Sequence, residues 1–175
     1  MLTQMVCAGF GGQGILTTGI LIANGAFNSG KRITWYPSYG SEMRGGTANC
    51  SVIVSDEEIG SPVIYEPTDV VVMNEASMRK FEPRLKKGGR LFVNTSIIKE
   101  DATRDDIEEL KIDSEAIAKE VGNLKVANMV MLGAIVRETG IVSMECVHKV
   151  IEKQFGKKRP EMIPMNLQAL EAWQK

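Results

Sequence analysis

Three glycines near the start of the chain have the spacing of a phosphate-binding turn. Gly9, Gly11 and Gly14 form the pattern Gly-x-Gly-x-x-Gly, with an apolar run at residues 5–8 before it and a helical pattern after it. Glycine lets the backbone turn tightly, so that N–H groups approach a phosphate at the positive end of the following helix. The pattern therefore predicts phosphate or nucleotide contact. The backbone donors would come from Gly9, Gly11, Gly12, Gln13 and Gly14.

Two other interpretations of this loop stay open. The glycines also suit a turn that only permits close packing of strand and helix. A site for NAD needs, in addition, a carboxylate about 20 residues further on, at the end of the second strand, where it binds the ribose. Residues 33–36 (Ile-Thr-Trp-Tyr) occupy that place, and the next carboxylate is Glu42 in a loop. The missing carboxylate makes NAD a less favoured ligand.

A second loop, rich in polar residues and glycine, spans residues 37–47. It follows the expected second strand, and open α/β sheets bind ligands at the carboxyl ends of their strands. Its arginine suits a bidentate contact to a carboxylate or a phosphate, and its glycine pair allows close approach of a neighbouring backbone. A solvated turn with an internal Glu–Arg ion pair is the alternative. The candidate site residues in this loop are Tyr39, Glu42, Arg44, Gly45 and Gly46.

The segments that must position these loops alternate between short apolar runs and helical patterns, which is typical of an α/β layer fold. We expect strands at residues 5–8, 32–36, 48–54, 69–73 and 90–93, the second of them stopped by Pro37. The first helix is expected to run from residue 15 to Ser29-Gly30, and later ones span residues 76–85, 114–121, 127–139, 143–155 and 164–173. Residues 99–109 are strongly charged and predict an exposed connection. The helices after residue 113 are expected to pack on one face or edge of the sheet.

Composition excludes several classes of function. The 175 residues predict a single domain over residues 1–175, and 43% hydrophobic with 25% charged residues is an ordinary globular balance. The net charge of −1 argues against a nucleic-acid binder. No apolar run reaches the roughly 20 residues that span a bilayer. The first residues lack the basic region of a signal peptide, so we expect a cytoplasmic protein with no membrane partner.

The cysteines and the single histidine argue against a metal centre held by this chain alone. Cys7, Cys50 and Cys146 are isolated, and His148 has no second histidine near it. A zinc site or an iron–sulfur cluster needs about four such ligands. The sequence contains neither a Gly-x-Ser-x-Gly elbow nor a convincing Cys–His pair. We therefore assign no catalytic residue and no metal ligand to this chain.

Four stretches together resemble one protein family. They are GFGGQGILTTGILIA, YPSYGSEMRGGTANCSVIVS, PTDVVVMN and GGRLFVNTS. The chain is similar to the gamma subunit of the 2-oxoacid:ferredoxin oxidoreductases, from residue 2 to about residue 174. The GxGGQG start and the YGSEMRGG loop are the most specific parts of this resemblance.

The resemblance implies a fold and a place in a larger enzyme. It implies a three-layer α/β/α Rossmann-like sandwich whose sheet is mostly parallel and allows an antiparallel edge strand. Members of the family oxidatively decarboxylate 2-oxoglutarate, branched-chain 2-oxoacids or pyruvate to acyl-CoA. Their complexes use thiamine diphosphate, Mg, [4Fe–4S] clusters and coenzyme A. Most of these groups are held by the alpha and beta subunits and, in some complexes, by a ferredoxin-like delta subunit. Ferredoxin is the electron acceptor.

By the same resemblance, this chain would be a structural and ligand-positioning subunit, inactive when isolated. The glycine-rich loop would lie near coenzyme A, and Arg44 with Tyr39 and Glu42 would face coenzyme A or the alpha subunit. A homodimer is an alternative assembly of the isolated chain. Two other functions stay open: a stand-alone nucleotide-binding sensor, and an interaction subunit that binds no ligand. We favour 2-oxoglutarate or a branched-chain acid over pyruvate, because the chain is compact.

Overall fold

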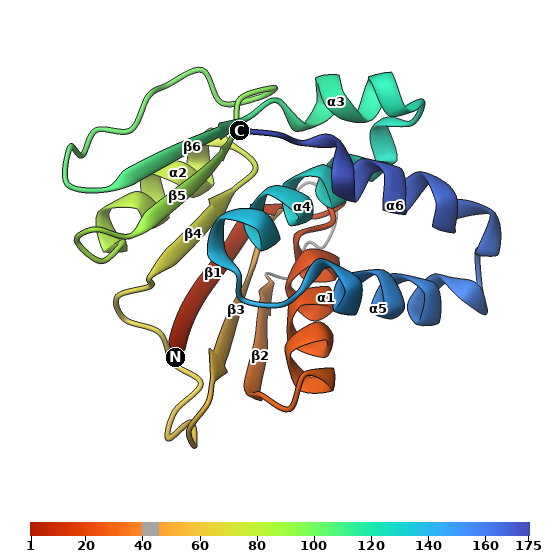
Figure 1. Ribbon diagram of the computed structural model, residues 1–175. Coiled ribbons are helices and arrows are strands. Elements are labelled where there is room, and N and C mark those ends of the chain that lie inside the picture. The colour runs from red at the N-terminus through yellow and green to blue at the C-terminus, as the bar shows by residue number, and fades with distance from the viewer. Residues whose placement is uncertain (40–45) are drawn as a thin grey trace.

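One six-stranded sheet forms the centre of the molecule (Figure 1). The computed structural model describes residues 1–39 and 46–175. The sheet order is β2-β3-β1-β4-β5-β6. The strands are β1 (Leu2–Phe10), β2 (Arg32–Tyr39), β3 (Thr47–Ser55), β4 (Asp69–Val72), β5 (Arg90–Asn94) and β6 (Glu108–Ile112).

Most of the sheet is parallel. The neighbours β1 and β4, β4 and β5, and β5 and β6 pair in parallel, whereas β3 pairs antiparallel with both β1 and β2. The prediction of a mostly parallel sheet with an antiparallel edge is confirmed. The strand that runs against the others is β3, one place in from the edge strand β2.

Helices cover both faces of the sheet, which confirms the three-layer α/β/α architecture. Alternate residues of β1 enter two separate cores: Met5 and Cys7 on one face, Val6 and Ala8 on the other. The first face packs against α1 (Ile15–Asn28), α4 (Ala127–Thr139), α5 (Met144–Gly156) and α6 (Ile163–Ala172). The second face packs against α2 (Glu75–Phe81) and the 3-10 turn η1 (Glu82–Arg84). The remaining elements are α3 (Ser114–Val121) and the 3-10 turns η2 (Leu124–Val126) and η3 (Pro160–Met162).

The predicted end of the second strand was wrong. β2 continues through Pro37 to Tyr39 and pairs with β3 along its whole length. Because β2 is an edge strand, one side of its backbone has no strand partner, and a residue without an N–H is tolerated there. The longer strand carries the chain directly to the second predicted loop.

The prediction of an exposed connection over residues 99–109 was wrong at its end. Glu108 begins β6, a short parallel edge strand in which Leu110 and Ile112 are buried. Side chains alternate along a strand, so Glu109 and Lys111 lie on the face opposite Leu110 and Ile112, and the exposed Glu108 begins the strand. The predicted helix 76–85 also ends early, at Phe81, and a 3-10 turn that contains Pro83 replaces its last residues.

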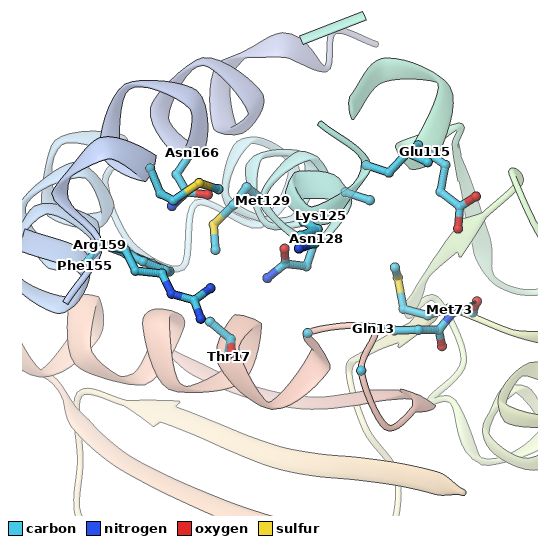
Figure 2. A pocket seen from close by; sticks show the side chains of 15 residues that line it. Gln13, Thr17, Met73, Glu115, Lys125, Asn128, Met129, Phe155, Arg159 and Asn166 are labelled. Carbon is cyan, nitrogen blue, oxygen red and sulfur yellow. Dashed lines mark hydrogen bonds between the residues drawn. The ribbon is translucent and has the colours of Figure 1, made fainter. Parts of the chain in front are cut away.

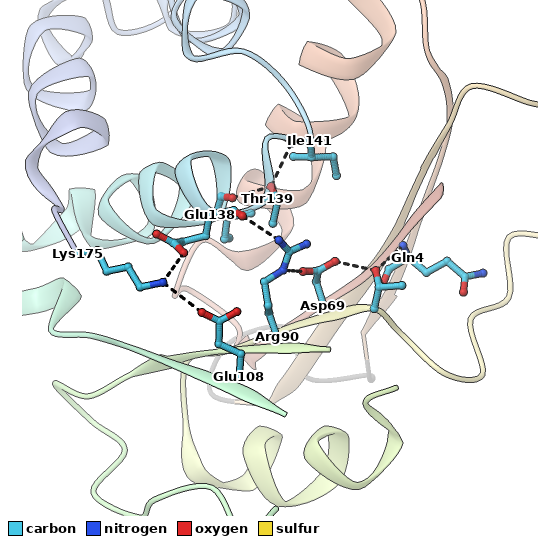
Figure 3. A network of polar contacts seen from close by, with 10 residues as sticks. Gln4, Asp69, Arg90, Glu108, Glu138, Thr139, Ile141 and Lys175 are labelled. Atoms are coloured by element: carbon cyan, nitrogen blue, oxygen red, sulfur yellow. Dashed lines mark hydrogen bonds and ion pairs between the residues drawn. The ribbon is translucent and has the colours of Figure 1, made fainter. Parts of the chain in front are cut away.

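A polar network joins the amino ends of β4, β5 and β6 to the helices above them (Figure 3). Asp69 is fully buried and forms an ion pair with Arg90 at 2.6 Å. A second guanidinium nitrogen of Arg90 donates to the carbonyl of Glu138 in the last turn of α4, at 2.8 Å. Lys175 bridges the carboxylates of Glu108 and Glu138. The network therefore fixes the end of the sheet that lies opposite the glycine-rich loop.

Candidate functional site

The glycine-rich loop closes on itself through the side chain of Gln13. Its Oε1 accepts from the N–H of Phe10 at 2.7 Å, and its Nε2 donates to the carbonyl of Met73, just beyond β4, at 3.0 Å. A Cβ added at Gly9 would come within 2.7 Å of this Oε1, so the loop requires glycine there. The Gln13 amide thus holds the loop against the sheet, and its role is one of positioning.

Gly14 marks the point where the loop becomes helix. Its φ of 77° is in the left-handed region, and an added Cβ would lie 2.7 Å from Cγ of Asn128 on α4. Glycine alone meets both demands without strain. The pattern of three glycines therefore predicted the turn and the strand–helix setting, although not the contact with α4.

The two predicted loops meet at one hydrogen bond. The N–H of Gly11 donates to the carbonyl of Gly46 at 2.9 Å, which brings the start of β3 beside the glycine-rich loop. Glu42, Arg44 and Gly45 lie outside the described residues. The structure describes the backbone of Tyr39, which is the last residue of β2.

Three helices begin around the same space above the carboxyl end of the sheet. α1, α4 and α6 start after Gly14, Val126 and Met162, and within the described residues none of the three has a side-chain cap. None has an acidic residue in its first turn. α4 and α6 continue from the 3-10 turns η2 and η3, which engage the N–H groups of Ala127 and Ile163. α1 starts directly after the glycine-rich loop, and the partial positive charge of its first N–H groups favours an anion.

These helix starts border a pocket of about 330 Å³. Its apolar wall contains Met73, Leu124, Met129, Phe155 and Met162, and its polar lining contains Gln13, Thr17, Glu115, Lys125, Asn128, Arg159 and Asn166. Figure 2 shows the Arg159 guanidinium pointing toward Thr17 on α1, with the Asn128 amide facing the same space. The pocket thus offers one guanidinium, one ammonium, one carboxylate and three amides beside apolar surface, and its two cations suit a ligand with an anionic group and an apolar part.

Asn166 is the most buried polar residue of this lining. Its side chain is 3% exposed, and its Nδ2 has no hydrogen-bond partner among the described residues. A buried amide without a partner costs free energy, and a ligand that accepts a hydrogen bond there recovers it. We did not predict Asn128, Arg159 or Asn166 from the sequence. An asparagine inside the apolar run of α4 was the one signal that pointed to the first of them.

The structure also bears on metal and membrane functions. In the two described ranges, no three His, Cys, Asp or Glu side chains come together as ligands for a metal ion. None of the helices in those ranges has both the length and the apolar character that a bilayer crossing requires. Cys7 and Cys50 face each other across β1 and β3, and both are buried. The hydrogen bond with Cys50, followed by burial, raises the pKa of the Cys7 thiol.

Fold and site together define a class of protein: a Rossmann-like α/β domain with a glycine-rich turn between β1 and α1. Residues 4–172 match the family model for pyruvate ferredoxin/flavodoxin oxidoreductase. The chain belongs to this family, which confirms the resemblance inferred from the sequence.

Curated relatives carry this domain in two ways. The ketoisovalerate oxidoreductase subunit VorA of Methanothermobacter marburgensis is 35% identical over 167 residues, and the match covers 94% of this chain but 34% of VorA. The chain therefore spans about a third of the length of that relative. The 2-oxoglutarate synthase subunit KorC of the same organism is 34% identical over 176 residues, which cover 97% of this chain and 95% of KorC.

Solved structures show the same two arrangements. The gamma subunit of a keto/oxoacid ferredoxin oxidoreductase from Geobacter sulfurreducens has a TM-score of 0.82 at 28% identity, with 97% of this chain and 95% of that chain covered. The 2-oxoglutarate:ferredoxin oxidoreductase of Magnetococcus marinus has a TM-score of 0.89 at 24% identity, and the match covers 97% of this chain and 30% of that chain. The second likeness shows the fold alone.

Proposed function

We propose that this chain is the gamma subunit of a multi-subunit, CoA-acylating 2-oxoacid:ferredoxin oxidoreductase. The observation that carries the proposal is the match with KorC, which extends over 97% of this chain and 95% of that subunit. The complex oxidatively decarboxylates a 2-oxoacid to an acyl-CoA. The relatives are named for different 2-oxoacids: ketoisovalerate for VorA, 2-oxoglutarate for KorC, and both pyruvate and ketoisovalerate for a common gamma subunit.

The chain's own part in this reaction is to position a ligand. We place a phosphate group of coenzyme A at the start of α1, beside the predicted donors Gly9, Gly11, Gly12, Gln13 and Gly14. The N–H groups of Gly11 and Gln13 already donate to the carbonyls of Gly46 and Phe10, so the donors to the phosphate come from the three other glycines. The Arg159 guanidinium and the Asn166 amide line the same pocket and supply further donors. Arg44, Glu42 and Tyr39, with Gly45 and Gly46, extend this site toward the alpha subunit or coenzyme A.

The other groups of the complex belong to partner chains in this proposal. Alpha and beta subunits hold the thiamine diphosphate, its Mg and the [4Fe–4S] clusters, a ferredoxin-like delta subunit is an optional member, and ferredoxin accepts the electrons. The three cysteines of this chain support that division, since Cys7 and Cys50 are buried as a pair and Cys146 lies on α5. We infer that residues 1–175 act as one domain, because all six strands share one sheet, and that the complex is cytoplasmic.

Steady-state kinetics of the purified complex test the ligand site. Arg159→Met removes the guanidinium that lines the pocket, and we expect KM for coenzyme A to rise about tenfold, the loss typical of one charge-assisted hydrogen bond. kcat and KM for the 2-oxoacid are expected to stay unchanged, because the lost contact binds coenzyme A equally well in the ground state and in the transition state. Lys158→Met removes a neighbouring exposed charge that does not line the pocket and is the matched control. An unchanged KM for coenzyme A in Arg159→Met contradicts the site.

Arg44 is tested in the same complex. Arg44→Ala is expected to weaken either assembly or the apparent affinity for coenzyme A, because a guanidinium binds a phosphate or a carboxylate through two hydrogen bonds. If both stay at the wild-type level, Arg44 has no role in the site.

A further inference from the structure

One half of one sheet face has no helix over it. α1 packs against β1, β2 and β3 on the first face, whereas α2 packs against β1 and β4 on the second. Figure 1 shows α1 in front of β2 and β3, and α2 behind the other half of the sheet. Ile53 of β3 is buried on this second face with Ile64, whereas no helix of residues 1–39 and 46–175 covers the rest of the second face of β2 and β3.

The strand register identifies the side chains on this open area. Val6 and Ala8 point toward α2, and residues directly opposite each other in antiparallel strands point to the same side. Ser51 pairs with Val6 and with Tyr36, so all three share that face. By the same register, Asn49 pairs with Ala8 and with Ser38.

We define the open sheet face as Phe10, Tyr36, Ser38, Asn49 and Ser51. Tyr36 is 59% exposed and Phe10 is 38% exposed. None of the five side chains carries a charge. Charged side chains are depleted, and tyrosine and phenylalanine enriched, at the centres of protein interfaces. One basic residue, Arg32, lies outside these five on the same side of β2, and a single positive charge is too little for a nucleic-acid site.

The edge of the sheet adds to the need for a cover. β2 is an eight-residue edge strand, and the groups on its outer side lack a strand partner. Folded proteins cover or block such edges, because a bare edge recruits other chains. The open sheet face and the open edge of β2 adjoin at Tyr36 and Ser38, so the surface of one partner can cover both.

The relatives indicate what this surface meets. In VorA the matching segment is 34% of one longer chain, so the same domain is covalently joined to the remaining two thirds. Where the domain is a separate polypeptide, as in KorC, a non-covalent contact must replace that link. A neutral patch with an exposed tyrosine at its centre suits a permanent contact of this kind.

We propose that the open sheet face docks the companion subunit that corresponds to the remaining two thirds of VorA. This proposal rests on the proposed function, since it requires the chain to be part of such a complex. Tyr36 is the anchor of the contact, and Ser38, Asn49 and Ser51 supply hydroxyl and amide groups for hydrogen bonds around it.

Tagged full-length chains, expressed in the source organism and purified without oxygen, test the proposal. Tyr36→Arg places a charge in the centre of the face, and we expect at least a tenfold loss of the companion subunit from the eluate, as for an aromatic anchor. Phe27→Arg is the matched control: Phe27 is a 66% exposed aromatic residue on α1, outside the face, and companion recovery stays at the wild-type level. Mass spectrometry identifies the companion by its similarity to the remainder of VorA.

A photo-crosslinking arm tests the contact without depending on the stability of the variant. p-Benzoylphenylalanine in place of Tyr36 is expected to crosslink to the companion, and the same group in place of Phe27 is not. If the wild type recovers the companion but Tyr36→Arg does so equally well, or if position 36 crosslinks to a second copy of this chain, the docking face is wrong and the proposed function stands. If the wild type recovers no companion, the proposed function fails and the docking face with it.

Discussion

At the scale of single residues, the two ends of the sheet use polar groups in opposite ways. At the amino end, Asp69 is buried and fully engaged by Arg90 and by the hydroxyl of Thr68. At the carboxyl end, the Asn166 amide is equally buried and its Nδ2 lacks a partner among the described residues. A satisfied buried group stabilises the fold, whereas an unsatisfied one marks a place where a ligand fits.

Loss of the Asp69 partner is the first residue-scale prediction. Arg90→Met leaves a buried carboxylate without its counter-charge and removes the hydrogen bond to the carbonyl of Glu138. We expect the free energy of unfolding at pH 7, measured by urea titration, to fall by about 3 kcal/mol. The control is Lys111→Met, which breaks an exposed pair with Asp101 and should cost about 0.5 kcal/mol or less. Equal costs for the two variants would contradict the structural role of the buried pair.

Asp56 gives a prediction about pH. Hydrogen bonds from Lys31 and then from the N-terminal ammonium group lower the pKa of its carboxyl from 3.8 to about 2. Because the folded pKa is below the unfolded one, the stabilisation is complete above pH 4 and disappears as the pH falls toward 2. NMR titration of the Asp56 carboxyl is expected to show the low pKa, and Lys31→Met to raise it toward 3.8. A wild-type pKa near 3.8 would show that these contacts do not form in solution.

At the scale of elements, local pattern predicted the strands and helices whose neighbours are close in sequence. β1, the glycine-rich loop and α1 follow one another, so the predicted turn was correct. The end of β2 at Pro37 and the existence of β6 were wrongly predicted, because both depend on a place at the sheet edge. Which strand lies at an edge is decided by long-range pairing, and sequence periodicity alone does not reveal it.

The crossing of α4 and α6 gives the element-scale prediction. A Cβ at Gly133 of α4 would lie 1.8 Å from the backbone carbonyl oxygen of Leu170 on α6. Backbone cannot rotate away as a side chain does, so Gly133→Ala forces the two helices apart and is expected to cost about 3 kcal/mol in free energy of unfolding. Without the clash, replacing a glycine inside a helix with alanine would stabilise the protein by about 1 kcal/mol. The sign of the change in free energy of unfolding therefore shows whether the clash exists.

The matched control is a helical glycine with room around it. An added Cβ at Gly156 of α5 would have its nearest contact at 3.9 Å, with Ile163. We expect Gly156→Ala to leave the urea midpoint unchanged or to raise it. A stabilised Gly133→Ala variant would show that α4 and α6 do not cross as closely as the structure places them.

At the scale of the whole molecule, residues near the end of the chain line the same pocket as the glycine-rich loop near its start. Arg159 and Asn166 lie more than 140 residues from Gly14 in sequence, and yet they line the same pocket. The helices after residue 113 pack on one face of the sheet, as predicted, and their starts then surround the glycine-rich loop. The sequence predicted the loop but not its second wall, because that wall is assembled only when α6 packs on α4 and α4 packs on α1.

Anaerobic affinity purification of the chain at its native expression level tests the central claim most directly. The eluate is assayed for dye reduction that depends on both a 2-oxoacid and coenzyme A, and a panel of 2-oxoacids identifies the substrate. We expect co-eluting partner subunits with visible iron–sulfur absorbance and this activity. A chain that elutes alone and colourless, with a bound nucleotide, would contradict the assignment to an oxidoreductase complex and would support a nucleotide sensor in its place.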